Sequence, residues 1–280
     1  MRQRFQRIWP DGIVDPLPAK IAAALTAELQ HRDATRYRVT LGARHWTPSI
    51  GQQVDQLAQT GIQTIIALPL SSHGSMMALR DYDKALRQAI EQNEGALQIV
   101  MVEHWHMAPG LLQTLSEHTQ AALARFPAER RDRVQAIFCA HSVAESARKS
   151  EEGYRQQMTE TASAITAQVG LALWHIGFHS AMGPGQWLEP DLLQLIDSGN
   201  AQGVQDVLVV ALGAIYDNVE LLYELDVEAV ERANSHGMHL ERAALPNTAP
   251  ATIAAMADLI EAVEVLAARH GVRVGGCLAT

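Results

Sequence analysis

The sequence predicts an α/β fold, doubly wound around parallel sheets. Short apolar segments rich in β-branched residues alternate with longer amphipathic segments along the 280 residues. The expected strands are apolar almost throughout, which is typical of parallel strands that helices cover on both faces. The chain length suits one large domain or two of moderate size, each able to bury its own core. Hydrophobic residues make up 48% of the chain and charged residues 19%, which is an ordinary globular composition.

The expected elements follow one another as strand, polar loop and helix. We expect strands at residues 36–42, 62–69, 97–103, 134–140, 172–178 and 206–212. We expect helices at residues 49–60, 76–93, 110–125, 151–169, 191–200, 219–235 and about 249–270. This alternation is typical of doubly wound domains, whose ligands bind at the carboxyl ends of the strands.

A charged, turn-prone stretch at residues 127–133 predicts the boundary between the lobes. The sequence therefore predicts an N-terminal lobe at 1–130 and a C-terminal lobe at 131–280, with the final helix packing back on the first lobe. Only three strands precede the boundary, so we expect a first strand to be missing there. An exposed sheet edge invites association, and we expect a second copy or residues 1–9 to cover it.

Composition and charge exclude several classes of protein. The formal net charge is −9 and there is no long basic run, which excludes nucleic acid as a partner. No apolar run reaches the roughly 18 residues of a transmembrane helix, and no signal peptide is evident. The only cysteines, Cys139 and Cys277, are far apart, which argues against a disulfide framework or an iron–sulfur cluster. A reducing cytoplasm suits this composition.

Histidines follow four of the five strands from residue 62 onward. His73 follows the first of these strands, His106 the second, His141 the third and His179 the fourth, and acidic residues follow the last. A single histidine is more often an ordinary loop or core residue. Their shared position at the carboxyl ends of strands favours a functional site.

An acidic row follows the strand at 206–212. Glu220, Glu224 and Glu228 are spaced at i, i+4 and i+8, which places them on one helix face. A solvated surface is the simpler interpretation. Against it, like charges at this spacing are mildly destabilising, and the row begins where ligands bind. Such carboxylates can conduct protons or deliver a divalent cation.

At these strand ends the sequence resembles the ferrochelatase family. Ala140-His141-Ser142 is similar to the family's Ser-Ala-His-Ser motif, and residues 217–226 to its Asp-His-x-Glu-Thr-Leu-x-Glu-x-Asp segment. Four further segments resemble the family's Leu-Ala-Pro-His, Glu-Ser-Trp-Tyr-x-x-Pro, Phe-Gln-Ser…Trp-Leu-x-Pro and Pro-x-x-Asn-x-x-Pro motifs; they lie at 68–73, 103–109, 178–190 and 245–250. Seven similarities in sequence order, the acidic row included, extend from about residue 11 to residue 262.

The resemblance implies two Rossmann-like lobes of the type II chelatase kind, with a porphyrin cleft between them. It implies a lyase of haem biosynthesis that inserts Fe²⁺ into coproporphyrin III or protoporphyrin IX. Iron is then a substrate, no cofactor is tightly bound, and the short bacterial form lacks an iron–sulfur cluster. The resemblance also implies that the acidic row lies along a partly π-helical turn. We expect a monomer or a weak homodimer.

The resemblance and the strand ends together assign roles. His141 would abstract pyrrole protons or make the last contact with the metal, and Glu220 would oppose it as acid–base partner or ligand. Glu224 and Glu228 would relay protons or deliver metal, and His73 is a peripheral metal candidate. The expected porphyrin-binding residues are Arg44, His45, Trp105, His106 and Ser180.

Two other functions stay open. One is a non-catalytic tetrapyrrole- or haem-binding protein on the same fold, since Asn218 replaces the family's usual histidine. The other is a chelatase for another metal, such as cobalt or nickel, and another tetrapyrrole. An assay with Fe²⁺ and porphyrin separates an enzyme from a binder, and a metal series separates the chelatases.

Overall fold

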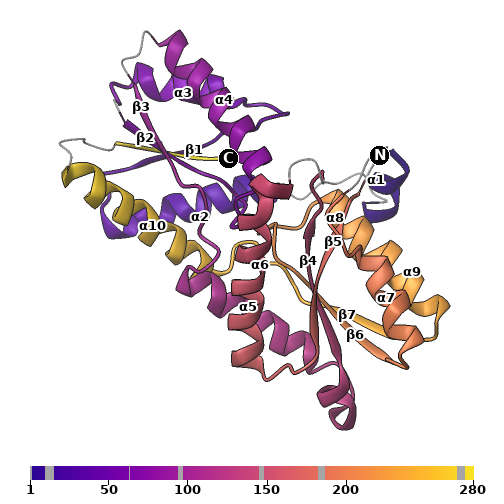
Figure 1. Cartoon of the computed structure of the whole chain (residues 1–280). Coiled ribbons are helices and arrows are strands. Elements are labelled where there is room, and N and C mark those ends of the chain that lie inside the picture. Colours follow the sequence, from indigo (N-terminus) through magenta and orange to yellow (C-terminus); the bar gives the residue numbers. More distant parts are fainter. Residues whose placement is uncertain are drawn as a thin grey trace. The chain divides into compact units, whose positions relative to one another are not determined.

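A computed structural model describes residues 2–9, 16–62, 64–93, 97–144, 148–181, 187–269 and 275–280 (Figure 1). The chain forms two compact units, each built from two stretches of sequence. We call Met1–Asp15 with Leu111–Asn247 the central unit, and Pro16–Gly110 with Thr248–Thr280 the flanking unit. Their bounds differ from the predicted lobes at 1–130 and 131–280. Residues 1–15 belong to the unit that contains residues 111–247, and residues 248–280 belong to the unit that contains residues 16–110.

The flanking unit contains a four-stranded parallel sheet in the order β1-β8-β2-β3. Its strands are β1 (Arg38–Leu41), β2 (Thr64–Leu68), β3 (Gln98–Met101) and β8 (Gly276–Ala279). The helices α3 and α4 cover one face and α2 and α10 the other (Figure 1). Their bounds are α2 (Leu17–Arg32), α3 (Ile50–Gln59), α4 (Met76–Gln92) and α10 (Pro250–Arg269).

The strand β8 lies inside this sheet, in register with β1 on one side and β2 on the other. The sequence predicts only three strands here, because β8 has four residues and begins at a glycine pair, Gly275-Gly276, that is typical of a turn. Helix α1 (Arg2–Ile8) packs against α8 (Val219–Tyr223) of the central unit. That residues 1–9 or a second copy cover an edge of the flanking sheet stays a prediction.

The central unit contains a second four-stranded parallel sheet, in the order β5-β4-β6-β7. Its strands are β4 (Gln135–His141), β5 (Trp174–His179), β6 (Asp206–Ala211) and β7 (His239–Arg242). Helix α6 covers one face and α7 and α9 the other (Figure 1). The helical segments are α5 (Pro109–Leu123), a 3₁₀ segment (Ala128–Arg133), α6 (Arg148–Val169), α7 (Leu192–Ala201), α8, a π turn (Glu224–Glu228) and α9 (Ala229–Ser235).

The two inner strands of this sheet, β4 and β6, lead to the candidate site at its carboxyl edge. Every residue of β6 is buried, and every residue of β4 is buried except the last, His141. Strands buried on both faces are apolar throughout, so the first polar residue after such a run emerges where the strand leaves the core. The α/β prediction and the six expected strands are confirmed, while β7, which is short and polar, was not predicted. None of the helices in the described ranges is long and apolar enough to cross a membrane.

Candidate active site

His141 is the last residue of β4 and faces a carboxylate. Its Nδ1 lies 2.7 Å from the carbonyl oxygen of Ser142, and because a carbonyl can only accept, Nδ1 must carry the hydrogen. In the neutral ring this leaves the lone pair on Nε2. Nε2 lies 3.8 Å from Oε1 of Glu220, and both side chains are partly exposed, at 50% and 35%. The structure thus brings together the two residues that the sequence singled out.

A helix N-cap places Glu220 in the first turn of α8. Asn218 has extended backbone, and its side-chain oxygen accepts from the backbone N–H of Leu221 at 3.1 Å. Asp217 is held from the other side, since its N–H donates to Asn247 Oδ1 at 3.0 Å and Asn247 Nδ2 donates to its carboxylate at 2.8 Å. The asparagine that replaces the family's histidine therefore starts the helix that carries Glu220.

Asn247 and Arg242 are two residues of the site for which the sequence predicts no role. Asn247 has a left-handed backbone, with φ of 50°, which asparagine tolerates better than most residues. Arg242, at the end of β7, contacts Asp226 at 2.5 Å and Asp217 at 3.5 Å. Asn247 lies in the motif at 245–250, which is a signal for a functional role. Arg242 has no comparable signal, because its strand is short and polar.

The acidic row begins on α8 and continues along a π turn, Glu224–Glu228, as the family resemblance implies. The three carboxylates have different sets of partners, although Glu224 and Glu228 both contact Arg4. Glu220 faces His141, Glu224 accepts from His179 Nδ1 at 2.7 Å, and Glu228 lies 3.7 Å from Arg4. Single π turns occur frequently at functional sites. The row is therefore more than a solvated helix face, since Glu224 is almost fully buried.

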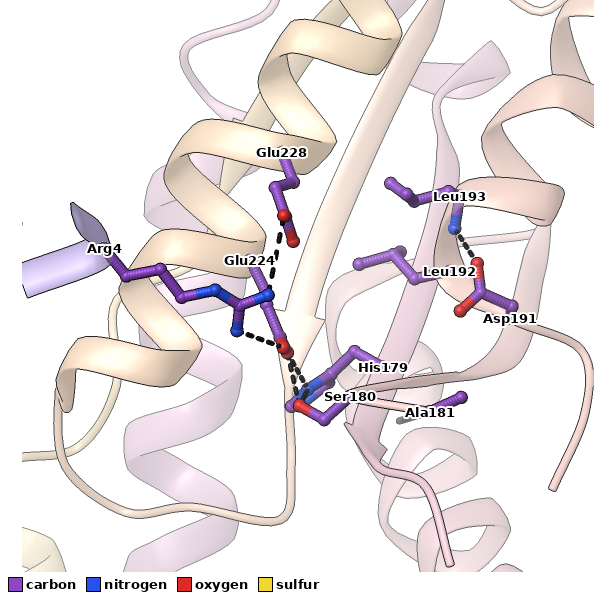
Figure 2. Close-up of a pocket in the computed structure, with 9 residues that line it drawn as sticks. All are labelled: Arg4, His179, Ser180, Ala181, Asp191, Leu192, Leu193, Glu224 and Glu228. Atoms are coloured by element: carbon purple, nitrogen blue, oxygen red, sulfur yellow. Dashed lines mark hydrogen bonds and ion pairs between the residues drawn. The ribbon is translucent and has the colours of Figure 1, made fainter. Parts of the chain in front are cut away.

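Figure 2 shows Glu224 among three donors, one from α1 and two from the end of β5. His179 Nδ1 and the hydroxyl of Ser180 both donate to its Oε2, and Arg4 Nη1 lies 3.2 Å from its Oε1. The guanidinium also lies 4.8 Å from the ring centre of Tyr223. Glu224 and its three donors line a pocket of about 240 Å³. Arg4 comes from helix α1, so a segment 220 residues away in sequence completes the acidic row.

The surroundings shift the pKa values of the two π-turn glutamates, Glu224 and Glu228, in opposite directions. Burial favours the neutral form of Glu224, but hydrogen bonds from His179 and Ser180 and the charges of His179 and Arg4 outweigh it, so its pKa lies below the ordinary 4.5. Burial is also the largest influence on Glu228, where Arg4 opposes it and Glu224 and Glu231 reinforce it. The pKa of Glu228 therefore lies above 4.5. Of the two, Glu228 is the better proton acceptor and Glu224 the more firmly ionised.

The family model for ferrochelatase matches residues 14–264. The chain belongs to the ferrochelatase family. The ferrochelatase of Deinococcus radiodurans is 32% identical over 255 residues, which are 89% of this chain and 81% of that protein. The coproporphyrin III ferrochelatase of Geobacillus kaustophilus is 29% identical over 93% of this chain and 83% of that protein. The family named from the motifs at the strand ends is thereby confirmed.

A solved structure supports the fold. SirB from Bacillus subtilis with Fe³⁺ superposes with a TM-score of 0.66 over 91% of this chain and 92% of that one, at 12% identity. Such low identity shows the fold alone. In this ferrochelatase-family chain, the parallel sheets of both units therefore match the architecture predicted from the alternating pattern.

The flanking unit holds the remaining predicted residues of this family member. His73 and His106 are buried, with ring centres 5.5 Å apart, and His73 Nδ1 lies 3.0 Å from the hydroxyl of Ser72. Trp105 is also buried, and its indole N–H donates to the carbonyl of Pro69 at 3.2 Å. The porphyrin-binding roles of Trp105 and His106 and the metal role of His73 stay predictions.

The loop after β1 is more open. Arg44 donates to the ring of its neighbour His45 at 2.7 Å and pairs with Asp81 at 2.9 Å, while Trp46 beside them is 80% exposed. Arg44 also lines a pocket of about 350 Å³ at the start of α3. A contact of Arg44 and His45 with porphyrin propionates stays a prediction.

No group of three or more His, Cys, Asp or Glu side chains within the described ranges is arranged to hold a metal ion. The His141–Glu220 pair supplies one nitrogen and one carboxylate, which suits a passing contact with a metal substrate better than a closed structural site. Cys139 and Cys277 are buried free thiols, and burial raises the pKa of each to about 12. Neither offers a thiolate near neutral pH.

Proposed function

We propose that this chain is a porphyrin ferrochelatase, a lyase that inserts Fe²⁺ into a porphyrin in haem biosynthesis. The observation that carries the proposal is the pair at the end of β4, where Nε2 of His141 lies 3.8 Å from Oε1 of Glu220. Membership of the ferrochelatase family supplies the reaction class.

The reaction replaces two pyrrole N–H protons by one Fe²⁺ ion and forms four iron–nitrogen bonds. A neutral imidazole is a suitable base near pH 7. The hydrogen bond from Nδ1 to Ser142 leaves Nε2 of His141 ready to accept a pyrrole proton. The carboxylate of Glu220 then stabilises the imidazolium and passes the proton on, so that Nε2 of His141 can accept the second pyrrole proton.

The acidic row offers the next acceptor. Glu228 has a raised pKa and lies at the partly exposed end of the row, so it suits the release of a proton to solvent. Glu224 is ionised and saturated with donors, so it suits electrostatic support of a cation better than proton uptake. We therefore assign the proton relay to Glu228 and support of the incoming cation to Glu224.

The test is an anaerobic assay of the purified chain with Fe²⁺ and a porphyrin, followed by the change in porphyrin absorbance. Coproporphyrin III and protoporphyrin IX are compared because relatives are named both for coproporphyrin III and simply as ferrochelatases. We expect saturable insertion of Fe²⁺ into at least one of them.

Two outcomes contradict the proposal. Tight porphyrin or haem binding without turnover would indicate a non-catalytic tetrapyrrole binder. Insertion of Co²⁺ or Ni²⁺ but not Fe²⁺, in a parallel metal series, would indicate a chelatase for another metal. The predicted cytoplasmic location and the monomer or weak homodimer stay expectations.

A further inference from the structure

His179 occupies the position beside His141 in the neighbouring strand. The two residues are register partners at the ends of β5 and β4, so their side chains leave the same edge of the sheet side by side. Their ring centres lie 5.9 Å apart with the planes at 62°, an edge-to-face arrangement. Because one hydrogen bond, to Ser142, fixes only Nδ1 of the half-exposed His141 ring, contact with His179 further limits its rotation.

The other side of His179 holds Glu224. Nδ1 lies 2.7 Å from Glu224 Oε2, and the two side chains are only 8% and 7% exposed. A buried carboxylate that loses a donor bears the full cost of desolvation. The hydrogen bond from His179 therefore fixes both the direction and the ionised state of Glu224.

The backbone at Ser180 brings a second donor to the same oxygen. Ser180 has φ of 62°, in the left-handed region that residues other than glycine rarely adopt. This turn at the end of β5 directs its hydroxyl to Glu224 Oε2 (Figure 2). Strained backbone persists where the surroundings determine it strongly, often at functional sites.

We propose that His179 is a positioning residue for metal insertion, whose single imidazole orients His141 on one side and Glu224 on the other. The inference rests on the proposed function of the His141–Glu220 pair. His179 does not itself touch the substrate in this role. It limits the rotation of the His141 ring and keeps a donor on the carboxylate of Glu224.

Two substitutions separate the two contacts of His179. His179→Ala removes both the ring contact and the hydrogen bond. His179→Gln keeps an N–H donor for Glu224 but removes the imidazole from beside His141, and glutamine is the residue in the family motif that 178–190 resembles. Ser180→Ala is the matched control, because it removes a donor from Glu224 and leaves the His141 contact intact.

The first readout is kinetic. We expect His179→Ala to lower kcat by about 10- to 100-fold, as is typical for partners that orient a reactive residue, with the KM for porphyrin changed by less than about threefold. His179→Gln should recover part of the loss and Ser180→Ala should lose less than either. A kcat for His179→Ala within about twofold of the unchanged chain would overturn the inference. So would equal losses of kcat and porphyrin affinity in all three variants, since that pattern marks general damage to the fold.

The second readout needs no turnover. Nitrogen-15 NMR of the substrate-free chain reports which nitrogen of His141 carries the hydrogen, and we expect a single Nδ1–H form. His179→Ala and His179→Gln should broaden the signal or mix the two tautomers, while Ser180→Ala should not. An unchanged His141 signal in both His179 variants overturns the inference even if the chain proves inactive. Absence of iron insertion with the expected NMR changes would instead count against the proposed function alone.

Discussion

Histidines stand at the carboxyl ends of strands in both units, but their partners differ. In the central unit His141 faces Glu220 at 3.8 Å and His179 faces Glu224 at 2.7 Å. In the flanking unit His73 faces the hydroxyl of Ser72 at 3.0 Å, and its ring lies against His106. A carboxylate stabilises an imidazolium, whereas a hydroxyl adds no charge. A histidine at a strand end of the central unit thus has a carboxylate partner that suits it for proton transfer.

Exposure strengthens the contrast. His141 is half exposed, while His73 is 3% exposed and His106 5% exposed. A base must be within hydrogen-bonding reach of the proton that it abstracts. We therefore place the chemistry in the central unit, and His73 of the flanking unit serves as the reference for His141.

The largest expected effect separates the two units directly. We expect His141→Ala to lower the rate of iron insertion by at least about 100-fold, because it removes the base, and to change porphyrin affinity by less than about tenfold. We expect His73→Ala, the matched change in the flanking unit, to cost less than about tenfold in rate. Stopped-flow insertion rates and fluorescence titration of porphyrin give the two quantities. Equal losses from the two substitutions would remove the distinction between the units.

The next prediction concerns the acidic row. We expect Glu224→Gln combined with Glu228→Gln to slow turnover by about tenfold at saturating porphyrin, because the row loses both its fixed charge and its proton acceptor. Porphyrin affinity should change less than turnover.

Glu231→Gln is the control for that pair. Glu231 is 61% exposed and contacts Arg7 of α1, so it shares the connection to α1 but not the contacts with Arg4 and His179. Turnover in the double variant equal to that of the control would mean that Glu224 and Glu228 have no part in turnover.

The smallest expected effect is on stability. It tests whether folding lowers the pKa of Glu224 and raises the pKa of Glu228. The pKa of Glu224 is lowered below 4.5, so its contribution to the free energy of unfolding is present above pH 4.5 and is lost as the pH falls through the lowered value. The pKa of Glu228 is raised, so its contribution is present below 4.5 and is lost as the pH rises through the raised value.

Urea unfolding of the unchanged chain, Glu224→Gln and Glu228→Gln across about pH 3 to pH 7 measures both contributions. We expect the deficit of Glu224→Gln to shrink on acidification below 4.5. Glu228→Gln should gain stability relative to the unchanged chain as the pH rises. Differences that stay constant with pH would show that folding shifts the pKa of neither carboxylate and would contradict the opposite shifts.

Much of the fold was predictable because its signals are local. A buried parallel strand needs a continuous apolar run, and β4 and β6 have such runs, so their ends and the residues that follow them could be found. His141 and Glu220 were identified from their places at or after the ends of these strands together with the family resemblance. The π turn at Glu224–Glu228 was expected from the family resemblance and is present.

The missed features depend on distant contacts or weak local patterns. Strand β7 (His239–Arg242) is polar, and β8 follows a glycine pair, so neither has the apolar run of a central strand. Arg4 reaches Glu224 across 220 residues, and nothing in the sequence of α1 indicates that contact. His179 was noted at a strand end, but only the register of β5 with β4 reveals that it adjoins His141.

The central claim is that His141 and Glu220 act as one unit, and a double-mutant cycle tests it most directly. Iron insertion is measured for His141→Ala, Glu220→Gln and the double variant under the same conditions. Residues that act as a unit are strongly non-additive. We therefore predict that the double variant is no slower than the slower single variant, within about twofold. A double variant whose loss equals the product of the two single losses would show that the residues act independently and would contradict the account.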